Sequence, residues 1–160
     1  MKKLFKLVLI TSLSVLFVAC VSGSKDVEKM YFYVKDDAAV ADEYYAYSYL
    51  TVIPNHEESV LNVDFSIVYT SEEQENYQTS AEVAEPYFTK FLDLSELILS
   101  EELVSKEVDE SVSLFQVTLD DKSNNRYEYE TSWDDDSLEH ESFKSFYLEL
   151  VDMLTVEVPV

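Results

Sequence analysis

A single glycine, Gly23, occurs in this chain of 160 residues, and it limits which turns and functional sites the chain can build. Phosphate-binding loops and dinucleotide-binding turns need glycine where the backbone takes positive φ or closely approaches an anion. The nucleophile elbow of serine hydrolases and the regular EF-hand calcium loop also need glycine at fixed positions. The sequence therefore excludes these sites, and we expect a non-catalytic protein that holds no cofactor.

The charge of the chain is strongly negative. Asp and Glu number 33 against 11 Lys and Arg, which gives a formal net charge of −22. Such a surface repels nucleic-acid phosphates, so we expect no nucleic-acid partner. Apolar residues at 47% and aromatic residues at 14% are too plentiful for a disordered acidic tail, so a packed core is expected. The charge either keeps the protein soluble or attracts basic partners.

The first twenty residues have the pattern of an export signal. Lys2, Lys3 and Lys6 precede an apolar run over residues 7–18, which is shorter than the ~20 residues that span a bilayer. The run ends in Leu16-Phe17-Val18-Ala19-Cys20, which resembles the lipobox of bacterial lipoproteins, although Phe17 stands where that family usually has Leu. A plain secretory signal cut near Gly23 is the alternative.

The lipoprotein resemblance implies how the protein is attached. Cys20, the only cysteine, would receive a diacylglyceryl group on its thiol and become the first residue after cleavage behind Ala19. Two or more acyl chains anchor a protein stably, at ~0.8 kcal/mol per buried methylene. The resemblance implies a bacterial membrane location on the extracytoplasmic side. Because Val21 rather than Asp follows the cysteine, it implies the outer membrane if the host is Gram-negative.

These features divide the chain into three parts. We expect a signal peptide over residues 1–19, a lipidated N-terminus and polar tether over residues 20–30, and a single acidic domain over residues 31–160.

Four segments of the domain alternate between apolar and polar residues, as half-buried strands do: residues 43–53, 60–69, 112–119 and 126–133. Turn residues join the first two segments at 54–58 and the last two at 120–125. The second turn is rich in Asp and Asn, which tolerate the left-handed conformation when glycine is not used. The sequence therefore predicts two β-hairpins.

Apolar residues at helical spacing predict two amphipathic helices, over residues 87–104 and 137–154. Pro86 suits a first helical position, and Asp134–Asp136 suit the positive end of a helix dipole. Within the polar residues 71–86, Ser71/Gln74 and Thr79/Glu82 have the spacing of capping boxes. Residues 156–160 are expected to form a short terminal strand. The prediction is an α+β fold of antiparallel hairpins packed with two helices, in the order hairpin, helix, hairpin, helix, which a duplicated ββα unit would produce.

Two aromatic stripes are the candidate binding residues. Tyr45, Tyr47 and Tyr49 share one strand face, and Tyr127, Tyr129 and Trp133 share another. Aromatic side chains on a strand face can bind a sugar ring or a protein partner, because they offer rigid area with polar tips. Alternatively, they pack under the helices or against each other across strands. An exposed stripe on a free sheet face would favour a binding module.

Acidic clusters and two histidines carry weaker signals. Asp134–Asp136, Asp120–Asp121 and the Glu128/Glu130 pair could offer oxygen ligands to a hard cation, but solvated loops and helix caps also account for them. We therefore predict no metal site. His56 and His140 are expected to be exposed, and two histidines without a spare thiol do not predict a zinc site.

Together these features predict a lipid-anchored protein of the bacterial cell envelope that acts as a non-catalytic binding or interaction module, with a protein or carbohydrate partner. One alternative is an inhibitor or accessory subunit that docks a basic partner by charge complementarity. A small hydrolase with paired carboxylates is a third.

Overall fold

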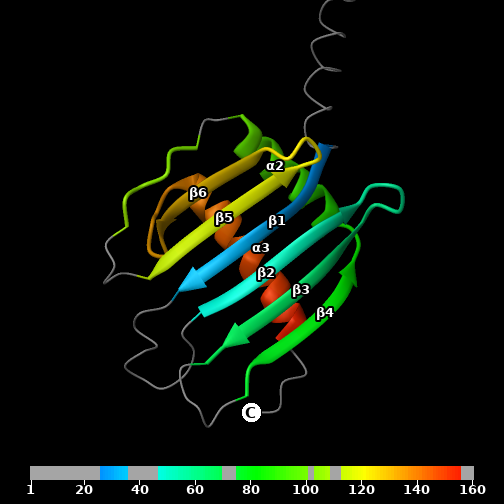
Figure 1. Ribbon diagram of the computed structural model, residues 1–160, viewed down its shortest axis with the longest axis horizontal. Helices are drawn as coiled ribbons and strands as arrows, with labels where there is room; N and C mark the ends of the chain where they lie inside the picture. Colours follow the sequence, from blue (N-terminus) through cyan, green and yellow to red (C-terminus); the bar gives the residue numbers. More distant parts are fainter. Residues whose placement is uncertain (1–25, 36–46, 70–74, 101–102, 109–112, 156–160) are drawn as a thin grey trace, which may run out of the picture.

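A computed structural model describes residues 26–35, 47–69, 75–100, 103–108 and 113–155. These residues form one antiparallel β-sheet and two α-helices, so the fold is α+β as predicted (Figure 1). The strands are β1 (Val27–Lys35), β2 (Tyr47–Asn55), β3 (Val60–Val68), β4 (Tyr77–Val83), β5 (Leu114–Asp121) and β6 (Arg126–Ser132). The helices are α2 (Tyr87–Leu99) and α3 (Leu138–Thr155). Neither described helix is long and apolar enough to cross a membrane.

The six strands lie in the order β4-β3-β2-β1-β5-β6, and every neighbouring pair is antiparallel. The predicted hairpins are present as β2–β3 and β5–β6. The predicted element order is wrong, however, because β1 and β4 add two strands before α2. The duplicated ββα unit stays a prediction.

Strand β1 corrects the boundary between the predicted tether and the domain. Residues 27–30, predicted as tether, lie in this central strand, where β2 and β5 pair with it from either side. Met30, Phe32 and Val34 are buried, whereas Tyr31 and Tyr33 point to the other face. The sequence of β1 does alternate between core-facing and outward-facing residues. The strand was missed because aromatic residues occupy both of its faces, and because the polar residues before Val27 resemble a linker.

Three further predictions between residues 71 and 104 are wrong. Thr79 and Glu82 form no capping box, because both lie in the edge strand β4. Pro86 is the residue before the helix and Tyr87 is the first residue of α2. The helix ends at Leu99 rather than at residue 104, and Lys106 already lies at the far edge of the sheet, where its N–H donates to the Glu130 carbonyl of β6 at 2.9 Å. The expected terminal strand lies outside the described residues.

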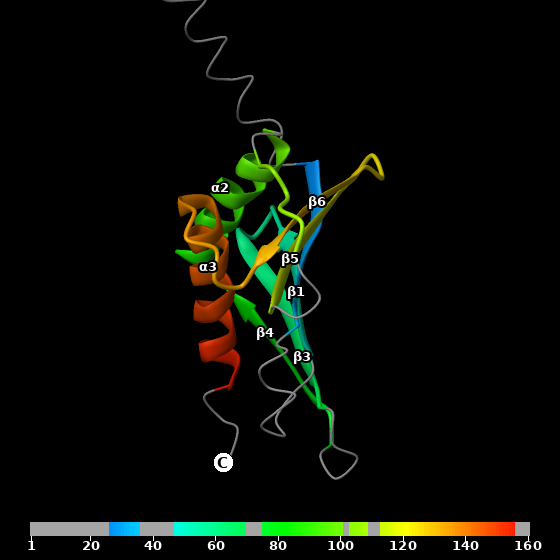
Figure 2. The ribbon, with the colours of Figure 1, turned by 90° about the vertical axis from the view of Figure 1, so that its left-hand side faces the viewer.

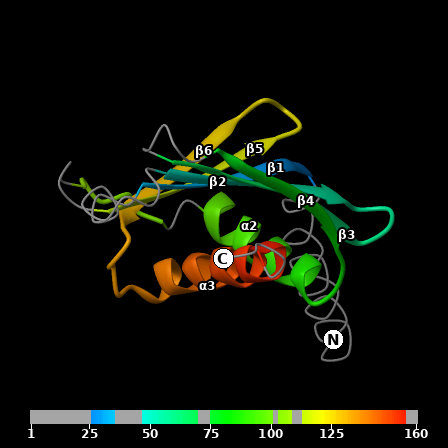
Figure 3. The ribbon, with the colours of Figure 1, turned by 90° about the horizontal axis from the view of Figure 1, so that it is seen from below.

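Both helices pack against the same face of the sheet, as Figures 2 and 3 show. The core between sheet and helices is unusually rich in phenylalanine, with large side chains that are almost completely buried: Phe32, Phe65, Phe91, Phe115, Phe143 and Phe146. Each aromatic side chain buries about 150–250 Å², so this layer supplies most of the hydrophobic stabilisation. A buried hydrogen bond of 2.6 Å between the hydroxyls of Ser48 and Tyr147 ties β2 to α3.

In the described residues, the turns reach positive φ with residues other than glycine. Ser59 and Asn124 take positive φ, 56° and 63°, in the β2–β3 and β5–β6 turns. Asp121 holds the second turn together, since its carboxylate accepts hydrogen bonds from the N–H groups of Ser123 and Asn125, both at 2.8 Å. The prediction that Asp and Asn would form this turn is confirmed.

Candidate functional site

The sheet has one face that no described helix covers, opposite the helix layer (Figure 2). Strand alternation places Tyr31 and Tyr33 of β1 and Tyr47 and Tyr49 of β2 on this open face, because the residues between them point into the core. We call these four residues the tyrosine patch. They come from the two central strands, so the patch lies in the middle of the open face.

Three rings of the tyrosine patch, those of Tyr33, Tyr47 and Tyr49, contact one another. Tyr33 lies directly opposite Tyr49 in the β1–β2 pairing, and their ring centroids are 5.1 Å apart. Tyr47 lies 5.6 Å from Tyr49 and 6.2 Å from Tyr33. Tyr49 remains 44% exposed despite these contacts. The three rings therefore form one continuous aromatic surface that is open to solvent.

A hollow of about 410 Å³ adjoins the tyrosine patch. The tip of the β5–β6 hairpin turns away from the helices toward the open side (Figures 2 and 3). Aromatic rings, hydroxyl groups, an amide and a guanidinium group line the hollow, from residues Tyr31, Tyr33, Tyr49, Thr51, Gln116, Thr118 and Arg126. This lining combines apolar ring faces with uncharged hydrogen-bonding groups and the Arg126 guanidinium.

Charged groups of both signs lie at the edge of the hollow. Asp120 accepts hydrogen bonds from Arg126 through Nε at 2.8 Å and Nη2 at 3.0 Å, and the Lys29 ammonium lies 3.9 Å away. The Arg126 guanidinium lowers the pKa of Asp120, so the carboxyl stays ionised at neutral pH. Lys29 also lies 5.2 Å from the ring of Tyr31, in cation–π contact. The hollow is therefore bordered by charged groups of both signs, which include the pair Arg126 and Asp120.

The predicted binding residues are divided between the two faces of the sheet. Tyr47 and Tyr49 belong to the tyrosine patch, whereas Tyr45 lies outside the described residues. Tyr127, Tyr129 and Trp133 point toward the helices, because they occupy the positions of β6 and its extension that face the core.

For these three residues the alternative prediction, that the aromatic side chains pack under the helices, is confirmed. Tyr129 is 3% exposed and stacks near Phe143 at 5.7 Å, and burial raises its pKa. Trp133 lies 5.7 Å from Phe115 and beneath the Lys144 ammonium. The sequence reasoning missed Tyr31 and Tyr33, which the alternation of β1 could have identified.

Two aspartates of the predicted acidic clusters, Asp135 and Asp121, stabilise local structure. Asp135 accepts the Thr131 hydroxyl at 2.6 Å and the Ser137 N–H at 2.8 Å, and it pairs with Lys106. The Lys106 ammonium is the main cause that holds the pKa of Asp135 well below its usual range. Asn125 likewise lowers the pKa of Asp121. None of these shifts has the upward direction that a general acid needs. Within the described segments, no group of three or more His, Cys, Asp and Glu residues is placed to hold a metal ion.

The prediction that His140 is exposed is wrong. Its side chain is fully buried, with Nε2 3.0 Å from the Trp133 carbonyl oxygen and the ring edge-on to Phe115 at 5.0 Å. His140 shares the buried stripe of α3 with Phe143 and Tyr147, which follow it at helical spacing. His56 is half-buried, with its ring 5.8 Å from Phe88. Both histidines thus have packing roles.

The chain matches no protein-family model and no curated protein. The functional conclusion therefore rests on the open face and its lining.

Proposed function

We propose that this protein is a lipid-anchored, extracytoplasmic protein of the bacterial cell envelope that acts as a non-catalytic binding module through the tyrosine patch. The observation that carries this proposal is the set of three mutually contacting rings on a sheet face without a described helix over it. Contiguous exposed aromatic area on a soluble domain usually marks an interaction site, because it would otherwise be buried.

The ligand that the lining fits best is a neutral carbohydrate. A sugar ring has an apolar face that packs on an aromatic ring, and its hydroxyls need donors and acceptors at the edge. Thr51, Thr118 and Gln116 offer such uncharged groups around the hollow. Arg126 is the charged residue of this lining, and it is already paired with Asp120.

Titration with short neutral oligosaccharides of hexose and N-acetylhexosamine units tests the proposal. We expect at least one of them to bind, and Tyr49→Ala or Tyr33→Ala to weaken the affinity about tenfold or more, since buried tyrosines dominate many interfaces. Leu148→Ala is the matched control, because Leu148 is an exposed apolar residue on α3, across the sheet from the patch. Binding to none of the sugars, or equal affinity for Tyr49→Ala and wild type, would contradict the carbohydrate proposal.

Crosslinking in the native cell tests the ligand class without a chosen probe. A photo-crosslinking amino acid replaces Tyr49 in one variant and Leu148 in the other. We expect glycan adducts at position 49 only. A discrete protein adduct at position 49 would instead identify the tyrosine patch as a protein interface.

The membrane anchor is proposed from the lipobox-like residues that end in Cys20. Cys20→Ala should move the protein from the membrane fraction to the soluble extracytoplasmic fraction, because no acyl chain could then be attached. Retention of this variant in the membrane fraction would contradict lipidation at Cys20. Val21 after the cysteine favours the outer membrane in a Gram-negative host.

A further inference from the structure

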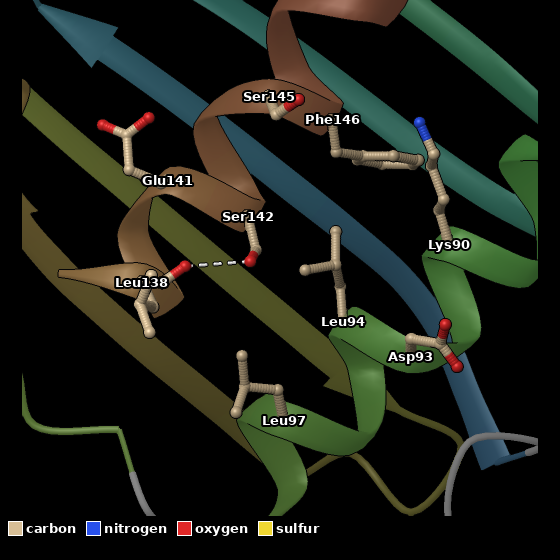
Figure 4. A pocket seen from close by; sticks show the side chains of 9 residues that line it. All are labelled: Lys90, Asp93, Leu94, Leu97, Leu138, Glu141, Ser142, Ser145 and Phe146. Atoms are coloured by element: carbon tan, nitrogen blue, oxygen red, sulfur yellow. Dashed lines mark hydrogen bonds between the residues drawn. The ribbon is translucent and has the colours of Figure 1, made fainter.

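The outer surface of the helix layer contains a second concave site, a groove between α2 and α3 (Figure 4). The groove has a volume of about 740 Å³, and it lies on the opposite side of the molecule from the tyrosine patch. Leu94 and Leu97 of α2 and Phe146 of α3 give it an apolar lining. Leu138 stands at one end with 83% of its surface exposed, so it adds an accessible apolar side chain to the lining.

The two helices run antiparallel along the groove. Lys90 of α2 pairs with Glu149 of α3 near one end, and Leu97 lies toward Leu138 at the other (Figure 4). Residues 90–97 of α2 cover about 10.5 Å at 1.5 Å per residue. An apolar stripe at positions i, i+3, i+4 and i+7 of a bound helix has the same length. The groove therefore fits two to three turns of an amphipathic helix.

The walls of the groove are acidic. Asp93 on α2 and Glu141 on α3 are exposed carboxylates on opposite walls, and the single basic lining residue, Lys90, is already paired with Glu149. Over their whole length, α2 and α3 carry six acidic residues and two lysines. A helix that places apolar side chains in this groove would gain most if its flanks carried Lys or Arg.

We propose that the groove between α2 and α3 binds a basic amphipathic helix of a partner protein. Apolar side chains of that helix would pack on Leu94, Leu97 and Leu138. Its basic side chains would lie against Asp93 and Glu141. This interface is separate from the tyrosine patch, so the protein would join two ligands from opposite faces.

A 14-residue designed peptide is the probe for this proposal. It carries leucines at i, i+3, i+4 and i+7, lysines on its other faces and a fluorophore for anisotropy measurements with the intact protein in mild detergent. We expect binding to weaken tenfold or more with Leu138→Glu, whereas Leu148→Glu should bind as wild type does. Leu148 is 45% exposed on α3 but does not line the groove. Both substitutions alter exposed residues, and circular dichroism checks that both variants fold.

Reversing acidic charges in the groove, and an equal number outside it, distinguishes specific docking of the peptide from its general attraction to a negatively charged protein. Asp93→Lys with Glu141→Lys should weaken binding at least tenfold, whereas Glu139→Lys with Asp152→Lys, which changes the net charge equally outside the groove, should weaken it much less. Equal loss in the two double variants would overturn the proposal, as would equal binding of Leu138→Glu and Leu148→Glu. Equally tight binding of a matched peptide with Glu in place of Lys would contradict the proposal that the partner helix is basic. Tyr49→Ala should leave peptide binding unchanged, which keeps this test independent of the tyrosine patch.

Discussion

The two faces of the sheet use aromatic residues in opposite ways. On the helix side, phenylalanine fills the closed space, as Phe32 and Phe115 do with no exposed surface. On the open side, the two positions that flank Phe32 on β1 carry tyrosine, Tyr31 and Tyr33. A phenol keeps its hydroxyl in water while its ring packs on neighbours, whereas a buried tyrosine must find a partner, as Tyr147 does in Ser48. Around Phe32 the two residue types therefore lie on opposite faces of β1, whereas elsewhere tyrosine also packs in the core, as Tyr129 does.

The largest expected difference between the two faces is in the folding free energy lost when an aromatic ring is removed. Phe32→Ala should destabilise the fold by about 3–5 kcal/mol, since it leaves a cavity in the core. Tyr49→Ala should cost at most about 1 kcal/mol, because the ring is partly exposed and only its contacts with Tyr33 and Tyr47 are lost. Urea denaturation measures both. Comparable losses for the two variants would mean that the open face is covered.

The comparison of buried and exposed positions also applies to two ion pairs, Asp135 with Lys106 and Asp120 with Arg126. Asp135→Asn should cost about 2 kcal/mol at pH 7, because the buried carboxylate bonds to Lys106, Thr131 and the Ser137 N–H. Asp120→Asn should cost at most about 1 kcal/mol, since its partner Arg126 is solvated.

The pH dependence of Asp135 has a definite sign. Its folded-state pKa is lowered, so the stabilisation is complete above the unfolded value of about 3.9 and is lost as pH falls below it. The stability difference between wild type and Asp135→Asn should therefore shrink below pH 4 in urea denaturation series. If the stability difference between wild type and Asp135→Asn stays constant down to pH 2, the ionised Asp135 carboxylate does not stabilise the fold through its contacts with Lys106 and the neighbouring donors.

Removal of single hydroxyls gives a smaller contrast. Tyr147→Phe leaves the buried Ser48 hydroxyl without its partner and should cost about 1–2 kcal/mol. Tyr49→Phe, on the open face, should change stability by no more than about 0.5 kcal/mol. The double variant Ser48→Ala with Tyr147→Phe should recover part of the loss. If the double variant is as unstable as the sum of the single ones, the two hydroxyls are not coupled.

The smallest effect concerns the turns that lack glycine. Ser59→Gly should stabilise the protein by about 0.5–1 kcal/mol, because serine is strained at positive φ. Asn124→Gly should gain less, since asparagine tolerates this conformation. Thermal denaturation compares the two variants, and an equal or larger gain at position 124 would argue against this explanation.

Local patterns predicted most of the secondary structure but not which face of a strand is covered. Alternation separates Tyr47 and Tyr49 from Ser48 and Leu50, and the Asp and Asn content of residues 120–125 predicted the hairpin turn around Asn124. It cannot tell that Tyr129 faces helices and Tyr49 does not, because that depends on strand order and on where the helices pack. For the same reason, His140 looked exposed among acidic neighbours although the rotation of α3 turns it inward.

Tyrosine-selective NMR during titration with a binding oligosaccharide tests the tyrosine patch most directly. We predict that the ring resonances of Tyr33, Tyr47 and Tyr49 move with saturation, while those of the buried Tyr129 and Tyr147 stay fixed. Unchanged patch resonances at saturation, or movement confined to Tyr129 and Tyr147, would contradict binding at the open face.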